Sequence, residues 1–339
     1  MWLAILKFRG LTLSLSLMVL LALDPAASLR AAESVPLVLE ARIPLGPASG
    51  RIDHLTVDLQ RQRLFVAELG NDSVGVIDLK SARLLRTLTD LSEPQGIVYV
   101  PATDELYVAN GGDGSVRVFR GPDLAPTARI ELGDDADNLR LNASRSQVVA
   151  GYGNGGLALI DVASHRVVAN VALQGHPEGL QLSSDARRAY VNVPDRTQIA
   201  MVDLEARERN VIWPTAELRS NFPLALESTG AGLWVAFRSP PRLVRFDTRL
   251  GKPTLILNTC GDSDDIFLDS ARRRIYVICG SGTLEVWDQA GASYSRTASL
   301  PTASGARTGL FVPELDRLFI ATRASPGHVA SIMVFRPAP

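Results

Sequence analysis

The chain has 339 residues, a formal net charge of −1, 46% hydrophobic residues and 21% charged residues. This composition is that of an ordinary globular protein with enough chain for a large core. The near-neutral charge argues against nucleic acid as a partner, because nucleic-acid-binding domains usually carry a basic footprint.

Residues 1–32 have the pattern of a secretory signal peptide. Lys7 and Arg9 precede Leu11–Leu23, a run of 13 residues that are apolar except for two serines and one threonine, and small residues follow it. A basic region, an apolar region and small residues in that order are typical of a signal peptide. The apolar run is short for a membrane-spanning helix, which needs roughly 20 residues. We expect a periplasmic or secreted protein with no membrane span after cleavage; an uncleaved anchor is the alternative.

A segment of about 42 residues recurs seven times from Arg51 to the C-terminus. Its most regular part is an apolar strand, and the starts of these strands lie 42, 42, 41, 44, 42 and 43 residues apart. A repeat of this period, built only from short strands, is typical of a β-propeller. The seven strands are Arg63–Val66, Glu105–Val108, Gln147–Ala150, Arg188–Val191, Gly232–Val235, Arg274–Val277 and Arg317–Ile320.

Each repeat divides into four strands bounded by Gly, Pro, Asn and Asp, as all-β folds require. In the second repeat the inner strand is predicted at Gly96–Val100. The three strands that follow it are predicted at Glu105–Asn110, Ser115–Phe119 and Pro126–Leu132.

The last repeat ends without an outer strand, whereas Leu37–Ile43 has strand character and precedes the first repeat. We expect this segment to complete the last blade, because closing the ring removes an open sheet edge. The predicted fold class is all-β: a seven-bladed β-propeller with four-stranded blades over residues 33–339, closed by its N-terminal strand. We expect a monomer.

The two cysteines of the chain, Cys260 and Cys279, both fall in the sixth repeat. Cys279 ends the second strand of that blade, and Cys260 lies in the loop that enters the first strand. Because these strands are antiparallel neighbours, both thiols are expected at one end of the blade. Export permits a disulfide between them; two separate free thiols are the alternative.

The second repeat carries a family resemblance. Leu106-Tyr-Val-Ala-Asn110 resembles the Tyr-Val-Thr-Asn core of the YVTN-repeat propellers, and Ser73–Leu79 followed by Leu84–Leu88 resembles the rest of that repeat. The wider group is similar to periplasmic YncE-like proteins, lactonase-like propellers and cytochrome d1 haem domains. Its members differ in function, so the resemblance implies location and architecture more than chemistry.

The loops that enter the inner strands and those that join the second and third strands share one face, where the mouth of the channel lies. The residue two positions before the first apolar residue of each inner strand forms a ring. Its members are Asp53, Gln95, Asp137, Glu178, Phe222, Asp264 and Thr308. The next position adds His54, Asn138 and Asp265, and the positions just before the ring add Asn221, Arg307, His176 and Asp262.

Acids this close repel one another unless a cation, a proton or a basic side chain compensates them. Oxygen-rich rings suit Ca²⁺, and nearby histidines allow a transition metal. The candidate metal ligands are Asp53, Asp137, Asn138, Glu178, Asn221 and Asp264. Solvated acids in a wet channel and a site for an organic cation remain alternatives.

Three arginines, Arg238, Arg307 and Arg323, are predicted to form a basic arc on blades five and seven. With Gln95, such an arc could orient an anionic ligand opposite the acidic sector.

Three functions follow from these patterns. The first is a module that binds a small-molecule or protein ligand at the channel mouth and performs no chemistry. The second is a metal-dependent hydrolase, with His54 or His176 as general base. The lactonase-like resemblance implies a Glu/Asn/Asn/Asp metal set for it, which Glu178, Asn138, Asn221 and Asp264 could supply. The third is an accessory redox role like that of the haem d1 propellers, with no covalent haem because no Cys-x-x-Cys-His motif is present.

Overall fold

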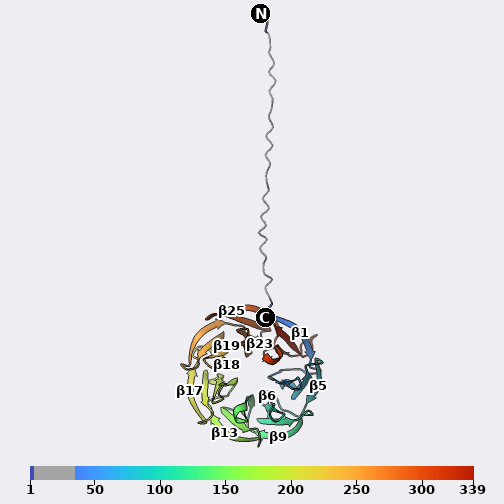
Figure 1. The fold of residues 1–339 in the computed structure, drawn as a ribbon, viewed down its shortest axis with the longest axis vertical. Helices are drawn as coiled ribbons and strands as arrows, with labels where there is room; N and C mark the ends of the chain where they lie inside the picture. Colours follow the sequence, from blue (N-terminus) through green and yellow to red (C-terminus); the bar gives the residue numbers. More distant parts are fainter. Residues whose placement is uncertain (4–34) are drawn as a thin grey trace. The chain divides into compact units, whose positions relative to one another are not determined.

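A computed structural model of the chain describes residues 1–3 and 35–339 and confirms the seven-bladed all-β propeller. Figure 1 shows the blades arranged around a central axis, with the chain running once around the ring. The predicted signal peptide falls outside the described residues except for its first three, so it stays a prediction. Within the described part of the chain, no helix has the length and apolarity needed to cross a membrane.

Each blade is an antiparallel sheet of four strands. In six of them the strands follow chain order from the axis outward, and in the seventh the outermost strand is the first strand of the chain. Blade one consists of β2 (Leu55–Asp58), β3 (Arg63–Glu68), β4 (Ser73–Asp78) and β5 (Arg83–Leu88). Blade two consists of β6 (Pro94–Val100), β7 (Glu105–Asn110), β8 (Ser115–Arg120) and β9 (Ala125–Glu131). Blade three consists of β10 (Ala136–Asn142), β11 (Gln147–Tyr152), β12 (Gly156–Asp161) and β13 (Arg166–Ala172).

The remaining blades repeat this arrangement. Blade four consists of β14 (Leu180–Leu182), β15 (Arg188–Val193), β16 (Gln198–Asp203) and β17 (Glu208–Pro214). Blade five consists of β18 (Arg219–Leu226), β19 (Gly232–Ser239), β20 (Pro241–Asp247) and β21 (Lys252–Asn258). Blade six consists of β22 (Ser263–Asp269), β23 (Arg274–Cys279), β24 (Thr283–Ala290) and β25 (Ser293–Pro301). Blade seven consists of β26 (Gly309–Val312), β27 (Arg317–Thr322), β28 (Ser331–Pro337) and β1 (Leu37–Pro44).

The predicted register of the repeat is confirmed, because all seven second strands begin at the residue expected from the sequence. Four three-residue 3₁₀ turns complete the secondary structure of the described residues: Leu69–Asn71, Ala143–Arg145, Pro194–Arg196 and Pro313–Leu315.

The closure of the ring is also confirmed. Strand β1 pairs antiparallel with β28 from Leu37 opposite Pro337 to Pro44 opposite Ser331. Leu37 and Ile43 are almost fully buried, so β1 contributes to the core as well as to the sheet.

The apolar core consists of seven clusters, one at each interface between neighbouring blades. Both faces of a middle strand therefore contact another blade. This explains why strands such as Arg274–Cys279 are almost wholly buried and do not alternate between polar and apolar residues.

Cys260 and Cys279 form the predicted disulfide, with Cα atoms 6.0 Å apart. The bridge ties the loop that enters β22 to the end of β23 on the mouth face. It lies in sequence beside Asp264 of the predicted ring and Asp262, which comes just before the ring. It therefore fixes the entry loop of blade six next to the channel.

Candidate site at the channel mouth

β-Bulges at the start of four inner strands hold residues of the predicted ring. The pairing register shifts between Pro94 and Ile97 in blade two, and at the equivalent point of blades three, five and six. A bulge bends its strand and re-aims the residues that it leaves unpaired. The residues left unpaired at these four points include Gln95, Asp137, Phe222 and Asp264, which all belong to the predicted ring.

Glycine allows neighbouring inner strands to approach closely at this level. A Cβ atom on Gly96 would lie 2.0 Å from the carbonyl oxygen of Asp137, a contact that no real side chain makes. The glycine after Gln95 therefore lets blade three dock against blade two and sets the position of Asp137.

Asp137, His176 and Glu178 converge at the mouth between blades three and four. One potential ligand atom from each residue lies within 4.8 Å of the other two. The Nε2 atom of His176 is 3.6 Å from Oδ2 of Asp137. The Nδ1 atom of His176 is 2.7 Å from the carbonyl oxygen of Gly153, to which it donates a hydrogen bond. This bond orients the imidazole ring so that Nε2 faces the two carboxylates.

The electrostatics of this cluster favour a positive charge in it. Burial, and then the negative charge of Asp137, raise the pKa of Glu178 above its usual range. Burial opposes a charge on His176, but the nearby carboxylate of Asp137 and the hydrogen bond to Gly153 outweigh it and raise the pKa of the imidazole. In the absence of another cation, a proton on His176 therefore compensates the acids.

A second polar group lies beside the mouth, between blades one, three and six. The Nδ2 atom of Asn138 is 3.0 Å from Nε2 of His54 and donates to it, which leaves the proton of the ring on Nδ1. That Nδ1 atom is 3.9 Å from Oδ1 of Asp265. Burial raises the pKa of Asp265 to about 7, partly offset by His54. The Oδ1 atom of Asn138 is buried and has no hydrogen-bond partner in the described part of the protein.

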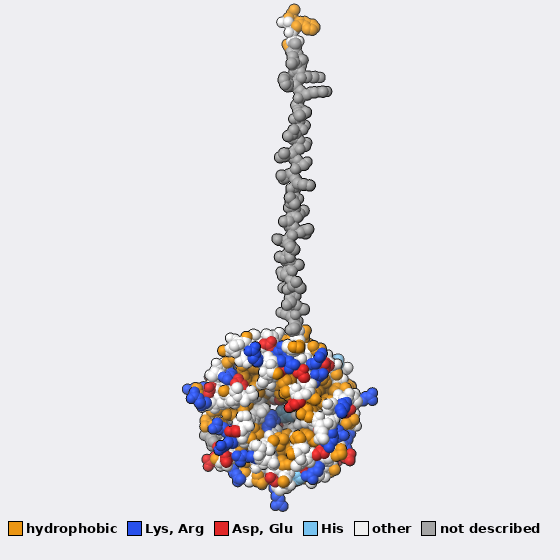
Figure 2. Space-filling view, in the orientation of Figure 1, with side chains coloured by type: hydrophobic (Ala, Val, Ile, Leu, Met, Phe, Trp, Pro, Cys, Tyr) orange, Lys and Arg blue, Asp and Glu red, His pale blue; other side chains and the backbone are white. Residues whose placement is uncertain are grey.

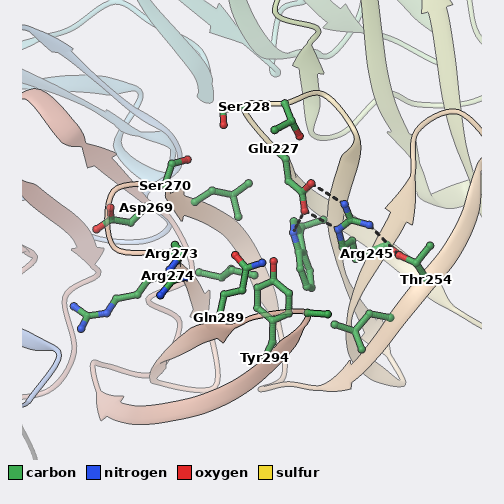
Figure 3. Close-up of a pocket in the computed structure, with 16 residues that line it drawn as sticks. Glu227, Ser228, Arg245, Thr254, Asp269, Ser270, Arg273, Arg274, Gln289 and Tyr294 are labelled. Carbon is green, nitrogen blue, oxygen red and sulfur yellow. Dashed lines mark hydrogen bonds and ion pairs between the residues drawn. The ribbon is translucent and has the colours of Figure 1, made fainter.

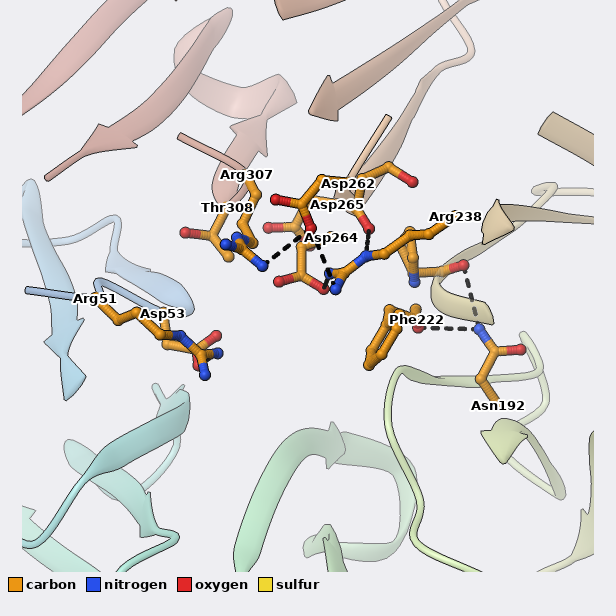
Figure 4. A network of polar contacts seen from close by, with 12 residues as sticks. Arg51, Asp53, Asn192, Phe222, Arg238, Asp262, Asp264, Asp265, Arg307 and Thr308 are labelled. Carbon is orange, nitrogen blue, oxygen red and sulfur yellow. Dashed lines mark hydrogen bonds and ion pairs between the residues drawn. The ribbon is translucent and has the colours of Figure 1, made fainter. Parts of the chain in front are cut away.

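Blades five to seven form a charge-paired sector (Figure 4). Arg238 donates to Asp264 at 2.6 Å and lies 3.2 Å from Asp262, and Arg307 donates to Asp262 at 3.0 Å. The guanidinium of Arg238 also stacks over the ring of Phe222, 3.8 Å from its centre. Burial raises the pKa of Asp264 to about 6, with Arg238 opposing the rise.

Asp53 has a comparable environment in blade one. It is 5% exposed and pairs with Arg51 at 3.3 Å. Burial and the charge of Asp137 raise its pKa to about 7.

The structure thus separates the candidate metal ligands. Asp137 and Glu178 meet, and His176, predicted as a general base, joins them. Asn138 contacts His54, while Asp53 and Asp264 pair with arginines. The Asn221 amide is fully buried and donates to Asn192 and to the carbonyl of Gln198. The four residues proposed for a lactonase-like set therefore do not form one cluster.

The predicted basic arc is also rearranged. Arg238 and Arg307 interleave with the acids of blade six and do not face an acidic sector from across the channel. Gln95 donates to Asp135 at 3.0 Å. Arg323 is exposed, and within the described chain it has no ion pair.

Two residues that the sequence analysis did not single out contribute to this region. The carbonyl of Gly153 orients His176, and it carries no side-chain signal. Arg140 lies two residues after Asn138 on β10. An alignment of the seven inner strands at that position would have shown it.

A cleft of about 550 Å³ lies between blades five and six, toward the face opposite the mouth (Figure 3). Its most prominent acid, Glu227, is bound by two nitrogens of Arg245 at 2.7 and 2.8 Å and by the indole of Trp234. These three side chains already pair with one another. Among the described residues, we therefore place the candidate site in the channel and not in this cleft. Figure 2 shows a hollow at the centre of the ring with charged side chains around it.

Comparison with known proteins supports the fold. No family model matches the chain, and no curated protein matches it. Among solved structures, the chain is similar to Kuenenia stuttgartiensis hydrazine synthase, with a TM-score of 0.74 and 14% identity over 89% of this chain and 97% of that chain. It is also similar to a chain in the crystal structure of a mitotic checkpoint complex, with a TM-score of 0.76 and 13% identity over 98% of this chain and 100% of that chain. At these identities the likeness shows the β-propeller fold alone.

Proposed function

We propose that this chain is an exported propeller of the YVTN-repeat type. In this proposal it binds a divalent transition-metal ion at its channel mouth and presents the ion to a small-molecule or protein ligand, without chemistry of its own. The observation that carries the proposal is the orientation of His176. Its Nδ1 donates to the Gly153 carbonyl and leaves Nε2 facing Asp137 and Glu178. Metal-binding histidines usually have their second nitrogen held in this way.

The donor set favours one class of ion. Ca²⁺ is bound by six to eight oxygen atoms, whereas one imidazole with two carboxylates suits zinc, manganese, iron or cobalt. Three protein ligands leave coordination positions for water or for a group of the bound partner. This donor set therefore supports a transition metal at the site. The oxygen-rich ring considered by itself favoured Ca²⁺.

The charges of the cluster support the same proposal. Asp137 is 6% exposed, and Glu178 lies beside it with a raised pKa, so the pair is costly to ionise without a cation. A divalent ion replaces the proton on His176 and neutralises both carboxylates. Binding is therefore expected to release protons.

The test is metal analysis and melting of the exported chain, purified without a tag. We expect one bound metal ion per chain and a rise in melting temperature with Zn²⁺ or Mn²⁺. At 100 times the dissociation constant, the gain is about 2.7 kcal/mol. The variants His176→Ala and Asp137→Asn should lose both signals.

Two control variants match these changes. His328→Ala removes an exposed histidine from another mouth-face loop, and Asp264→Asn removes a mouth acid that pairs with Arg238. Both should retain the metal response. Equal metal content in wild type and His176→Ala would overturn the proposed site.

The hydrolase is tested on the same samples. Hydrolysis of a lactone panel by the metal-loaded chain, lost in His54→Ala, would replace the binding-module proposal. Metal binding with no hydrolysis supports it. Cell fractionation tests export, and light scattering tests the expected monomer.

A further inference from the structure

A ring of seven register-equivalent residues lies one level below the mouth. In each blade, the ring member is the inner-strand residue that pairs with the third residue of the second strand. For example, Val98 is opposite Tyr107, and Phe267 is opposite Tyr276. The ring members are Thr56, Val98, Arg140, Gln181, Ala225, Phe267 and Leu310. Arg140 is the one charged residue among them.

The ring lines the channel. Six of its seven members are partly exposed, whereas the residue before each of the six is buried. These strands are the innermost of their blades. Because neighbouring blades cover both faces of each blade, the exposed part of these side chains contacts solvent in the channel. Arg140 therefore places its guanidinium in the channel, about 7 Å along the strand from Asn138.

Arg140 has no carboxylate partner there. Its one hydrogen bond runs from Nη1 to the carbonyl oxygen of Leu139, at 2.8 Å. Asp137 and Asp265 act on it through their charge, but neither forms an ion pair with it in the described structure. Burial lowers the pKa of the guanidinium. Arg140 is only partly exposed, and arginines with little access to water are usually paired, because an uncompensated charge away from water is costly.

The other polar members of the ring already have partners. The hydroxyl oxygen of Thr56 accepts a hydrogen bond from the backbone of Tyr99 at 3.2 Å, and Gln181 donates to the carbonyl of Leu224 at 3.5 Å. The remaining wall at this level is apolar, from Val98, Phe267 and Leu310. The channel below the mouth is thus an apolar collar with one unpaired cation.

We propose that this collar binds a small organic monocarboxylate, with its carboxylate on Arg140 and its apolar body against Val98, Phe267 and Leu310. A guanidinium binds a carboxylate through two parallel hydrogen bonds. Asp137 and Asp265 both act on Arg140 through their negative charge, so a dianion such as phosphate is repelled more strongly than a monoanion. The proposal does not depend on a metal at the mouth.

The test is calorimetric titration of the exported full chain with benzoate and, separately, with inorganic phosphate, in the presence of a chelator. We expect benzoate to bind and phosphate to bind more weakly. Arg140→Gln should weaken benzoate binding by about 10-fold or more, the value of a lost charged hydrogen bond. Arg323→Gln removes an exposed arginine of the mouth face and should leave the affinity unchanged.

Stability gives a second measurement on the same variants. Because Arg140 is unpaired, Arg140→Gln should raise or preserve the melting temperature of the ligand-free chain. Crystals soaked in 4-bromobenzoate should show bromine anomalous density inside the collar. Unchanged benzoate affinity in Arg140→Gln, tighter binding of phosphate than of benzoate, or bromine density outside the channel would overturn the proposal. The chelator makes these outcomes independent of those for the metal site.

Discussion

The Nε2 atom of His176 lies 3.6 Å from Oδ2 of Asp137, across the boundary between blades four and three. The two residues are 39 positions apart (176 − 137) and come from successive copies of the repeat. Each reaches the mouth from the loop or bulge that begins its inner strand. The propeller thus brings neighbouring positions of successive repeats together in space, since Glu178 is the repeat equivalent of Asp137 and His176 lies two residues before Glu178. On the other side of the mouth, Arg307 and Asp262 meet in the same way, whereas Arg238 reaches the acids of blade six from the end of β19.

The ion pair between Arg238 and Asp264 should contribute to stability. Arg238→Gln leaves Asp264 and Asp262 without their shared cation, in a region where both members of the 2.6 Å pair are mostly buried. We expect a loss of roughly 1–3 kcal/mol in the free energy of unfolding, measured by urea titration. The double variant Arg238→Gln/Asp264→Asn should recover part of it. A double variant less stable than the sum of the two single changes would contradict this account.

The channel acids should make the protein less stable as pH rises from mildly acidic to mildly basic. The folded-state pKa values of Asp53, Asp264 and Asp265 are about 7, 6 and 7, above the ordinary value of 3.8. Between these values the folded chain holds more protons than the unfolded chain, so stability falls with increasing pH. With a chelator present, the melting temperature should decrease from pH 5 to pH 8.

The variants Asp53→Asn and Asp265→Asn should each make that decrease shallower, because the amide does not ionise. An acid on the surface, Glu314, provides the control, and Glu314→Gln should leave the pH dependence unchanged. A wild-type melting temperature that rises steadily over the same interval would show that these acids do not control it.

The disulfide should stabilise the fold through the unfolded state. Cys260 and Cys279 are separated by 19 residues, and closing a loop of this length contributes about 3 kcal/mol. Replacing both cysteines with serine should lower the midpoint of urea unfolding accordingly. Adding reductant to the wild type should give the same midpoint as the double variant, and alkylation without reductant should label neither thiol in the oxidised protein.

Strand β1 should be essential for the ring. Deleting residues 33–44 removes Leu37 and Ile43, whose burial alone is worth about 3–6 kcal/mol, and exposes the edge of β28. We expect the truncated chain to melt far below the full-length chain or to aggregate. A chain that begins at Val35 retains β1 and should melt like the full-length chain. If the larger deletion melted within a degree or two of it, the closing strand would not be required.

The architecture was readable from the sequence because it depends on periodic and local properties. Strand starts such as Arg188 and Gly232, the closing segment at Leu37 and the disulfide all follow from the repeat period, strand length and the antiparallel order within a blade. The bulges at the start of four inner strands include members of the ring that the sequence predicted at the mouth.

Which ring residues meet was decided by the tertiary structure. The sequence placed Asn221 and Asp137 at similar positions, but the Asn221 amide turns into the interface with blade four while Asp137 faces His176. The ring of His176 takes its orientation from a backbone carbonyl, which has no sequence signature. Arginine side chains are long enough to reach either of two neighbouring loops, and Arg238 pairs with the acids of blade six. Such choices depend on rotamers and on distances of a few ångströms between blades, and linear spacing along the chain does not determine them.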